Sequence, residues 1–508
     1  MFLVSLLAPW LYWPLLLISL FVLRAMYRKY LHPLCNVPGP FLAPTTNLWR
    51  LAVFLRGRQH HEYLALFQKY GPLVRIGPNS VILNDQTHFA EFFGYDKSPW
   101  WKAFRGRIRD FNHGFITSMK DHAKAKSQVM GGYTMSNVLK SEEEVDRHVS
   151  ELMKQFSAKC GTIFDIAPWT QWAAFDIAMD VAFSNPLGFI KSGSDVGGLI
   201  GSLHELLTGA GSIALFPSIV NFMQQSWVFP FIAPRTTDKR GPGAIYGLAW
   251  SQLNRRFEGK DTGRHSDILQ WLIDHENRNG ERLSRGRLEE ESVAPVIAGS
   301  DTAATVLRAI VLFLSTNRRV LDKLRREIDN ADEAGVLSTP PKYKELTQHV
   351  PYIAAIMKES LRLYPVLGSP IFRETPKDGA TISGHYLPPC TEIGICQYAV
   401  GRNTAIFGED ADRFRPERWT EEVDAATRKL REAGDVSFGH GAMKCSGRNV
   451  AMLQVWKIAT QVFRQFEIEV VDPVQPWQEK NSLIILNWDF KVRFELREKT
   501  TTHVPLVS

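Results

Sequence analysis

The sequence predicts a mainly α-helical protein with small subsidiary β-sheets, preceded by one N-terminal transmembrane helix. Apolar residues return every three or four positions over long runs such as 288–313 and 447–466, which is the helical period. Short stretches rich in branched apolar residues, such as 73–76 and 80–83, are bounded by Gly, Pro or Asn and predict strands. Hydrophobic residues make up 44% of the 508 residues, so the chain can bury a large core.

Residues 1–23 are predicted to be a transmembrane signal anchor, because they contain no charged side chain. A helix of this length, at ~1.5 Å per residue, spans a ~30 Å hydrocarbon core. Basic residues begin at Arg24, so the positive-inside rule places the rest of the chain in the cytosol. The alternative is a cleaved signal peptide, but the segment lacks a charged start and an Ala-x-Ala site. Residues 24–45 are predicted to form a basic and proline-rich hinge that includes Asn-Val-Pro-Gly-Pro at 36–40.

Charge and cysteine usage exclude several classes of protein. The net charge is +7 and no long basic run occurs, so we predict no nucleic-acid partner. None of the five cysteines forms a C-x-x-C pair, which gives no support to zinc ribbons, thioredoxin chemistry or covalently attached haem. The odd and sparse set of cysteines suits a reducing compartment.

One cysteine lies in a glycine-containing loop directly before a predicted helix. The pattern is Phe438-x-x-Gly441-x-x-x-Cys445-x-Gly447, and the helix occupies 447–466. The glycines allow a tight bend and a close approach to a flat ligand. A cysteine at a helix N-terminus is expected to stay a thiolate, and a lone thiolate is a good axial ligand for haem iron. The alternative is a buried structural cysteine.

An acid and an alcohol lie midway along the apolar run 288–313. The segment Ala298-Gly-Ser-Asp301-Thr302 is expected within one long helix, kinked at Pro295. Polar groups inside a buried helix are costly unless they have partners or a task. Gly299 is expected to permit a local opening of the helix. The plainer interpretation is a solvated Asp301 and a Thr302 that bonds back to its own helix.

Glu359 and Arg362 are expected to share one face of an apolar helix, three residues apart. A Pro-x-Arg segment that ends at Arg418 follows between this helix and the cysteine loop. In that order, these motifs and the two described above resemble the cytochrome P450 family over nearly the whole chain.

The resemblance implies that residues 46–508 form one haem-thiolate monooxygenase catalytic domain with the cytochrome P450 fold. It makes Cys445 the ligand of the haem iron, and it assigns Thr302 to binding dioxygen and Asp301 to proton delivery. It also implies a buried Glu359–Arg362–Arg418 network that braces the cysteine loop; losing one member of such a network costs roughly 3–5 kcal/mol.

The resemblance implies further haem contacts from the cysteine loop and from basic residues. Arg373 matches the arginine that the family uses for a haem propionate. His122 and Lys126 stand at the spacing of the family's usual Trp-x-x-x-Arg pair, so the chain departs from the pattern at both positions. Met443 replaces the usual basic residue two places before the cysteine, with Lys444 adjacent. Together with Cys445, the cofactor contacts are therefore expected to be His122, Lys126, Arg373, Phe438, Gly441 and Gly447.

The resemblance indicates substrate contacts only as regions of the chain, and the alternative for each candidate residue is an ordinary place in the hydrophobic core. Aromatic and aliphatic side chains in them predict an apolar ligand. The candidates are Trp101, Phe104, Val296, Ala298, Val366, Leu367, Ile484 and Ile485. The apolar segment 212–233 is predicted to be a helix–loop region that covers the pocket and dips into the membrane interface, with plain core burial as the alternative.

The predicted function is that of a membrane-anchored monooxygenase that oxidises an apolar small molecule with O₂. A Gly-x-Gly-x-x-Ala pattern at 209–214 resembles a dinucleotide-binding motif, but it follows a helical run and not a strand, so we predict no nicotinamide or flavin domain in this chain. The electrons are therefore expected from NADPH through a cytochrome P450 reductase, with cytochrome b5 as a further partner. The overall sequence resembles fungal members of the family similar to pisatin demethylase, which implies terpenoid or polyketide secondary metabolism. The expected location is the endoplasmic reticulum membrane, single-pass, with the catalytic domain facing the cytosol.

Two other functions stay open. One is a haem-thiolate isomerase or dehydratase that needs no external electrons. The other is a non-catalytic membrane haem sensor or carrier. The Asp301–Thr302 pair favours oxygen activation over both.

Overall fold

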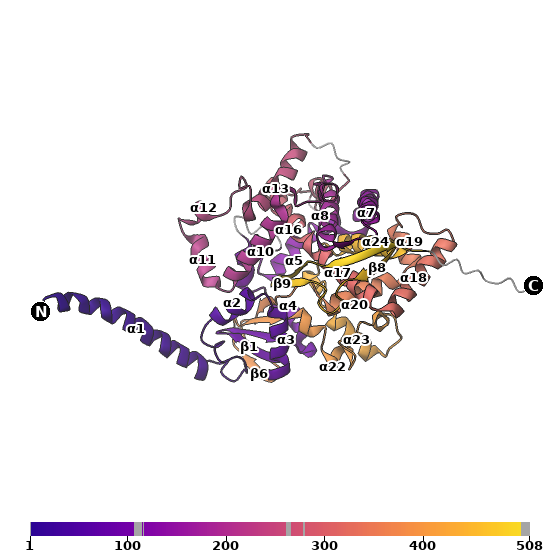
Figure 1. Ribbon diagram of the computed structural model, residues 1–508. Helices are drawn as coiled ribbons and strands as arrows, with labels where there is room; N and C mark the ends of the chain where they lie inside the picture. The colour runs from indigo at the N-terminus through magenta and orange to yellow at the C-terminus, as the bar shows by residue number, and fades with distance from the viewer. Residues whose placement is uncertain (1, 106–113, 115, 261–265, 278–279, 499–508) are drawn as a thin grey trace, which may run out of the picture.

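The N-terminal helix α1 (Phe2–Tyr30) projects from the body of the molecule (Figure 1). The computed structural model describes residues 2–105, 114, 116–260, 266–277 and 280–498, with only the backbone of residues 2–12. The helix continues past Leu23, where the predicted anchor ends, through the first basic residues to Tyr30. The predicted hinge therefore begins as helix and becomes turns only after that point.

The body is mainly helical, and its helices before the long apolar run surround the short strands. In chain order these are α2 (Leu48–Leu55), α3 (Gln59–Tyr70), α4 (Phe89–Gly94), α5 (Met119–Ser127), α6 (Met135–Val138), α7 (Glu142–Ser157), α8 (Ala167–Phe183), α9 (Phe189–Ser192), α10 (Leu199–Ala214), α11 (Pro217–Gln225), α12 (Phe229–Ile232), α13 (Gly241–Phe257) and α14 (Ile268–Asp274). The helices that follow are α15 (Arg285–Glu291), α16 (Val293–Ala298), α17 (Asp301–Thr316), α18 (Arg318–Glu333), α19 (Tyr343–His349), α20 (Tyr352–Leu363), α21 (Gln397–Val400), α22 (Thr404–Phe407), α23 (Ala425–Gly434) and α24 (Arg448–Gln465). Three 3-10 turns matter below: η2 (Pro99–Phe104), η6 (Pro416–Trp419) and η7 (Gly441–Met443).

The strands form four small sheets, as the sequence predicts for a subsidiary β component. The largest has the order β1-β2-β7-β4, in which β2 and β7 are parallel and the other pairs are antiparallel. The strands are β1 (Leu73–Gly77), β2 (Ser80–Leu83), β3 (Ile163–Asp165), β4 (Ile371–Glu374), β5 (Ala380–Ile382), β6 (His385–Leu387), β7 (Glu392–Ile395), β8 (Phe466–Val470), β9 (Gln478–Ser482), β10 (Ile484–Trp488) and β11 (Lys491–Leu496). The remaining sheets are the hairpin β9–β10, the sheet β3-β11-β8 and the pair β5–β6.

Helix α17 crosses the core and packs against α8, α20, α24 and β10. The apolar run that the sequence predicts as one helix is divided into α15, α16 and α17. Pro295 lies inside α16, and one break falls at Ser292, within the turn before it, where a proline removes a helical hydrogen bond. A second break falls at Gly299–Ser300. The second break has a steric cause: a Cβ on Gly299 would lie 2.5 Å from the Cβ of Ala178 on α8, so only glycine lets the two helices approach this closely. The opening that we expected at Gly299 is therefore present.

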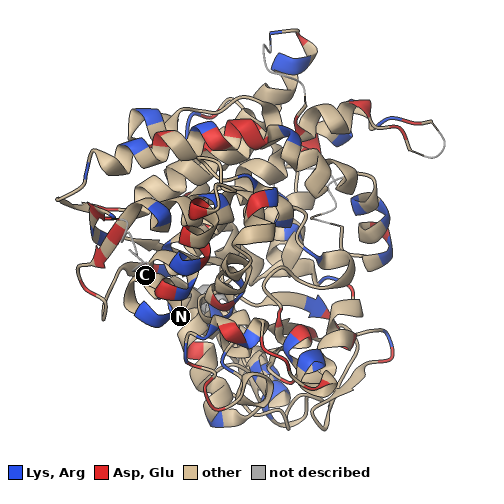
Figure 2. Ribbon diagram, turned by 90° about the vertical axis from the view of Figure 1, so that its right-hand side faces the viewer, with Lys and Arg blue, Asp and Glu red and all other residues tan. Residues whose placement is uncertain are grey.

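The segment 212–233 forms the end of α10 followed by α11 and α12, and most of its large apolar side chains are exposed, although Leu215 and Val220 are buried. Phe222 is 75% exposed and Trp227 is 81% exposed, and Ile219 and Phe231 are also exposed. The alternative of plain core burial is therefore wrong for these side chains. In Figure 1, α11 and α12 lie on the same side of the body as α1. Figure 2 views the opposite side, where Lys, Arg, Asp and Glu are distributed over many helices.

Among the residues whose side chains are described, one helical stretch, 285–316, is long and apolar enough to cross a membrane. Two thirds of its most apolar window is buried inside the protein, as expected for a core helix. A second stretch passes the same test only if α10 and α11 are joined across a bend of 106°.

The linker after α1 is fixed to the sheet by the buried side chain of Arg75 on β1. Its guanidinium donates hydrogen bonds to the carbonyl oxygens of Arg28 (3.0 Å), Leu34 (3.1 Å) and Pro78 (2.7 Å). Burial lowers the pKa of Arg75 to about 10. One buried cation thus joins the last turns of α1, the linker and the sheet.

Candidate functional site

The cysteine loop is a tight turn that ends at the start of α24. The Cys445 N–H donates to the carbonyl oxygen of Phe438 at 2.7 Å, which closes the loop. Gly439 has φ +70°, and a Cβ there would lie 2.8 Å from the carbonyl oxygen of Met443. Gly441 also has a positive φ, +55°, whereas Gly447 has an ordinary φ of −78°. The sequence-based interpretation therefore missed the steric role of Gly439 and gave it to Gly447 instead.

The Cys445 side chain lines a cavity of about 430 Å³ between this loop and α5, and is accessible from it. Protein nevertheless surrounds the sulfur, and this burial raises the pKa of the free thiol. The N–H groups of Gly447 and Arg448 and the charge of Lys126 act in the opposite direction but do not outweigh it. A coordinated metal ion would favour the thiolate, because metal binding deprotonates a thiol.

Asp301 begins α17 and is 2% exposed. Its Oδ1 accepts hydrogen bonds from Nε2 of His204, at 3.0 Å, and from the side-chain amide of Gln171. His204 lies on α10 and is one-third exposed, whereas Gln171 lies buried on α8. The Oδ2 atom of Asp301 is buried and has no hydrogen-bond partner. A buried carboxylate oxygen of this kind is costly unless it has a task.

Thr302, the residue after Asp301, donates from Oγ1 to the carbonyl oxygen of Ala298 at 2.7 Å. The plainer interpretation of this segment is thus right about Thr302, which bonds back to its own helix, and wrong about Asp301, which is buried. Ala298 is exposed and Thr302 is half-buried, while Val296 is fully buried. Of the two predicted wall residues on this helix, Ala298 faces open space and Val296 is packed in the core.

The predicted basic residues gather beside the cysteine loop. His122 and Lys126 on α5 are buried, and Nε2 of His122 and Nζ of Lys126 each donate to the carbonyl oxygen of Ala442 at 3.0 Å. Arg373 on β4 is fully buried and donates from Nη1 to the carbonyl oxygen of Tyr95. Its Nε and Nη2 atoms are buried without a hydrogen-bond partner. These donors suit an anionic group that would complete their hydrogen bonds.

Lys97 joins this cluster, and sequence reasoning missed it. It pairs with Arg373 in an isolated β-bridge, and its Nζ lies 3.1 Å from Nδ1 of His122. Burial, and then the charges of Arg373 and Lys126, lower the pKa of Lys97 to about 7. Two carboxylates bound nearby would reverse this shift, so the cluster of Lys97, His122, Lys126 and Arg373 fits the propionates of a haem. The only signal in the sequence was a lysine next to an aromatic stretch.

The Glu359–Arg362–Arg418 network is present and buried. Arg362 donates to both carboxylate oxygens of Glu359, at 2.8 and 2.7 Å, and Nε of Arg418 lies 3.3 Å from Oε1. Trp419 also donates to this carboxylate, at 2.9 Å. The remaining donors of the two arginines reach carbonyl oxygens of residues 401, 407, 410, 411 and 413. Within the described residues, the hydrogen bonds of the network therefore hold the segment 401–413, which precedes the loop 438–447.

The other predicted wall residues form two groups. Leu367 pairs with Ile484 in a β-bridge, and the N–H of Ile485 donates to the carbonyl oxygen of Val366 at 2.9 Å. Thr305 on α17 donates to the carbonyl oxygen of Ile485 at 3.2 Å, which joins this group to the core helix. In the second group, on η2, Trp101 donates to the carbonyl oxygen of Phe372, next to Arg373, at 3.0 Å, and Phe104 packs on Trp100.

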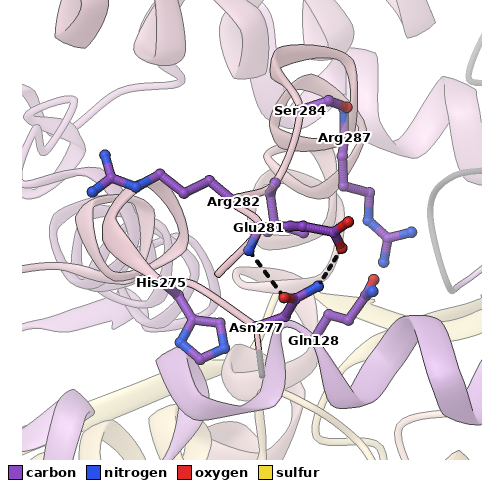
Figure 3. A pocket seen from close by; sticks show the side chains of 8 residues that line it. Gln128, His275, Asn277, Glu281, Arg282, Ser284 and Arg287 are labelled. Carbon is purple, nitrogen blue, oxygen red and sulfur yellow. Dashed lines mark hydrogen bonds between the residues drawn. The ribbon is translucent and has the colours of Figure 1, made fainter. Parts of the chain in front are cut away.

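A separate pocket of about 210 Å³ lies between α14 and α15 (Figure 3). Asn277 and Glu281 exchange two hydrogen bonds across it, at 2.8 and 3.0 Å. Arg282, which also lines it, pairs with Glu276 at 3.0 Å. This pocket shares no lining residue with the cavity beside Cys445.

A cysteine presented by a closed loop, a buried acid beside a helix break and a buried cationic cluster define a mainly helical haem-thiolate protein. The sequence profile of the cytochrome P450 family matches residues 38–494, so the chain belongs to the cytochrome P450 family. It is 30% identical over 465 residues to the cytochrome P450 monooxygenase gsfF of Penicillium aethiopicum, covering 89% of this chain and 91% of that protein. It is 28% identical over 497 residues to the cytochrome P450 monooxygenase cicH of Emericella nidulans, covering 96% and 98%.

A cytochrome P450 monooxygenase of Aspergillus terreus is likewise 30% identical over 480 residues, covering 89% of this chain and 93% of that protein. The family and these relatives make the chain an oxidoreductase of the monooxygenase class. The family also implies a haem whose iron is held by a cysteine thiolate.

Proposed function

We propose that this chain is a membrane-anchored monooxygenase that inserts one oxygen atom into an apolar small molecule in fungal secondary metabolism. The observation that carries the proposal is the buried Asp301, followed by Thr302, at the break before α17, with a partner histidine that reaches solvent. A protein that only stores or senses haem has no need of a buried acid with an uncommitted oxygen.

The residues present fit a haem. Cys445 would hold the iron, and Arg373, Lys97, His122 and Lys126 would hold the propionates, because these buried cations include donors that lack acceptors. When bound through a thiolate, haem supplies the chemistry of dioxygen activation and O–O cleavage. The protein's part is to orient the substrate, deliver protons and exclude other water.

We assign proton delivery to a short path that begins at the surface. His204 reaches solvent and donates through Nε2 to Oδ1 of Asp301, with Gln171 fixing the same oxygen. The Oδ2 atom of Asp301 is the position at which a proton can be held, because no other group occupies it. Thr302 follows at once, and its Oγ1 can exchange its bond to Ala298 for a ligand. His204 is thus a positioning and relay residue, and Asp301 is the catalytic acid.

The test is the coupling of NADPH consumption to product in His204→Asn and Asp301→Asn. Difference spectra against terpenoids and polyketides first find a substrate that shifts the spin state of the iron. Both variants are expected to keep the wild-type carbon monoxide spectrum and to form several-fold less product per NADPH, with more hydrogen peroxide. Unchanged coupling in both variants would contradict the proton path. Product formation without NADPH would favour the isomerase or dehydratase alternative, and no product or peroxide with any bound ligand would favour the haem carrier.

Electrons would come from NADPH through cytochrome P450 reductase, with cytochrome b5 as a second donor. Support comes from exposed lysines around the cavity beside Cys445, namely Lys120 and Lys124 on α5 and Lys444 in the loop. Cations on this face would attract a partner with an acidic face. The binding of such a partner should weaken as the salt concentration rises.

Membrane attachment is proposed from α1 and from the exposed apolar side chains of α11 and α12. The described side chains of α1 before Arg24 are almost all apolar and exposed. Large exposed apolar patches mark sites at which proteins contact membranes or other proteins. Since α11 and α12 lie on the same side of the body as α1 (Figure 1), one membrane can contact all three. The expected site is the endoplasmic reticulum, with the catalytic domain in the cytosol.

The substrate is proposed to be apolar, such as a terpenoid or a polyketide. Support comes from the relatives, which are fungal monooxygenases, and from the aliphatic residues Ile484, Ile485 and Leu367 that meet beside α17. On either side of the break before α17, Ala298 is exposed and Thr302 is half-buried.

A further inference from the structure

Two histidines at the start of α3 and a glutamate on β9 converge on one point outside the haem site. Nε2 of His60 lies 3.2 Å from Oε1 of Glu479, and Nε2 of His61 lies 2.8 Å from the same atom. One ligand atom from each of the three residues lies within 4.8 Å of those of the other two. Within the described part of the chain, no other group of His, Cys, Asp and Glu meets this criterion.

The spacing suits a tetrahedral zinc ion. Zinc binds imidazole nitrogen and carboxylate oxygen at about 2.0–2.1 Å, so two of its ligands lie about 3.3 Å apart. The two N···O separations at Glu479 are 3.2 and 2.8 Å, so an ion could enter with shifts of about a tenth of an ångström for His60 and about half an ångström for His61. Two histidines and a glutamate are a ligand set that zinc accepts, with the fourth position open.

The second oxygen of the carboxylate is already held by other donors. Tyr364 donates from its hydroxyl to Oε2 of Glu479 at 2.7 Å, and the indole N–H of Trp477 donates to it at 3.4 Å. Oε1 therefore points at the two imidazoles, in the way that outer hydrogen bonds orient metal ligands. The ring of Tyr398 packs edge-on against both histidines, with centroid distances of 4.9 and 5.0 Å.

The ring of His60 can change tautomer to accept a metal. Its Nδ1 is buried without a hydrogen-bond partner, so Nδ1 can carry the ring proton when Nε2 gives its lone pair to the ion. His61 is half-exposed and opens the point to solvent.

We propose that His60, His61 and Glu479 form a zinc site, with water as the fourth ligand, that is independent of the haem. The ion would join α3 to the hairpin β9–β10, which are already linked by the bond from the Asn481 N–H to the carbonyl oxygen of Gly57 at 2.7 Å. That hairpin carries Ile484 and Ile485. Zinc binding would therefore stiffen one wall next to the core helix without contacting the cysteine loop.

The experiment uses the full-length haem-loaded protein in detergent, freed of metal by a chelator, with Zn²⁺ alone as the probe. Competition with a chromophoric chelator should show one Zn²⁺ per protein. Glu479→Gln and His61→Ala should each weaken binding by about 100-fold or more, and Tyr364→Phe, which removes only an outer hydrogen bond, by about 10-fold. The matched control is His148→Ala, because His148 also contacts a carboxylate, Asp180 at 2.8 Å, but has no third ligand.

Zinc-edge X-ray absorption identifies the ligands directly, because the iron of the haem does not contribute at that edge. The expected signal is nitrogen and oxygen at about 2.0–2.1 Å. Sulfur at about 2.3 Å would place the ion on a cysteine and overturn the proposal. Equal affinities for wild type, Glu479→Gln and His61→Ala, or an equal loss in His148→Ala, would overturn it too.

Discussion

Replacing Glu359 by Gln should destabilise the protein far more than an equivalent change at a neighbouring carboxylate. Glu359 is fully buried and accepts hydrogen bonds from Arg362, Arg418 and Trp419. The substitution keeps the size of the side chain but removes the counter-charge of the buried Arg362, and it leaves the buried Arg418 with Asp410 alone, 3.1 Å from its Nη1. Breaking a buried pair in this way costs about 3–5 kcal/mol, which is a large part of the 5–15 kcal/mol that holds a typical protein folded.

The matched control is Glu417→Gln, because Glu417 lies on η6 directly before Arg418 in the sequence. It binds Arg319 at 2.8 and 3.1 Å, but that arginine is 63% exposed. Glu417 also accepts from the hydroxyl of Tyr352 at 2.6 Å, a bond that the amide oxygen of glutamine can keep, so the substitution mainly removes the ion pair with the exposed arginine. An ion pair with an exposed partner is worth about 0.2–1 kcal/mol. Urea unfolding, followed by tryptophan fluorescence in detergent, measures both variants. Trp419→Phe, which removes one hydrogen bond to Glu359, gives a milder variant should Glu359→Gln not fold. Equal losses for Glu359→Gln and Glu417→Gln, or a stable Glu359→Gln, would refute the reasoning.

Three further outcomes are expected. Arg373→Leu should speed haem loss to apomyoglobin at least several-fold while Cys445 still gives the red-shifted carbon monoxide band; an unchanged rate would remove Arg373 from the propionate site. The folded-state pKa of Lys97 is lowered to about 7, so the folded haem-free protein binds fewer protons than the unfolded chain between about pH 7 and pH 10. The free energy of unfolding should therefore rise with pH in this range, and Lys97→Met should flatten that rise. Phe222→Ser with Trp227→Ser should weaken the binding of a protein lacking residues 1–30 to lipid vesicles, as measured by flotation, whereas no change would show that α11 and α12 do not contact lipid.

Much of the fold could be predicted because its signals are local. The helical period of 447–466 and the strands at 73–76 and 80–83 appear in the structure with shifts of a residue or two at their ends. The close approach at the second break of the core helix could not be predicted from the sequence. It brings Gly299 against Ala178, and these two residues lie far apart in the sequence.

The candidate site likewise contains residues that the sequence could predict and residues that it could not. Motifs of fixed spacing singled out Cys445, Asp301 and the Glu359 network, and the structure places His122 and Lys126 against the cysteine loop. The partners of these residues were beyond the sequence. His204, Gln171 and Lys97 reach the site through tertiary packing, and nothing in their neighbouring residues sets them apart from an ordinary surface histidine, glutamine or lysine.

The clamp formed by Arg75 has a mechanical consequence. Since one guanidinium grips carbonyl oxygens from the end of α1, the linker and the sheet, the joint between helix and body resists swivelling. A bilayer that sets the direction of α1 would therefore also set the tilt at which the body rests on it. Arg75→Ala would remove these hydrogen bonds and make the joint between α1 and the body flexible, so the range of tilt angles of the body should widen in oriented bilayers.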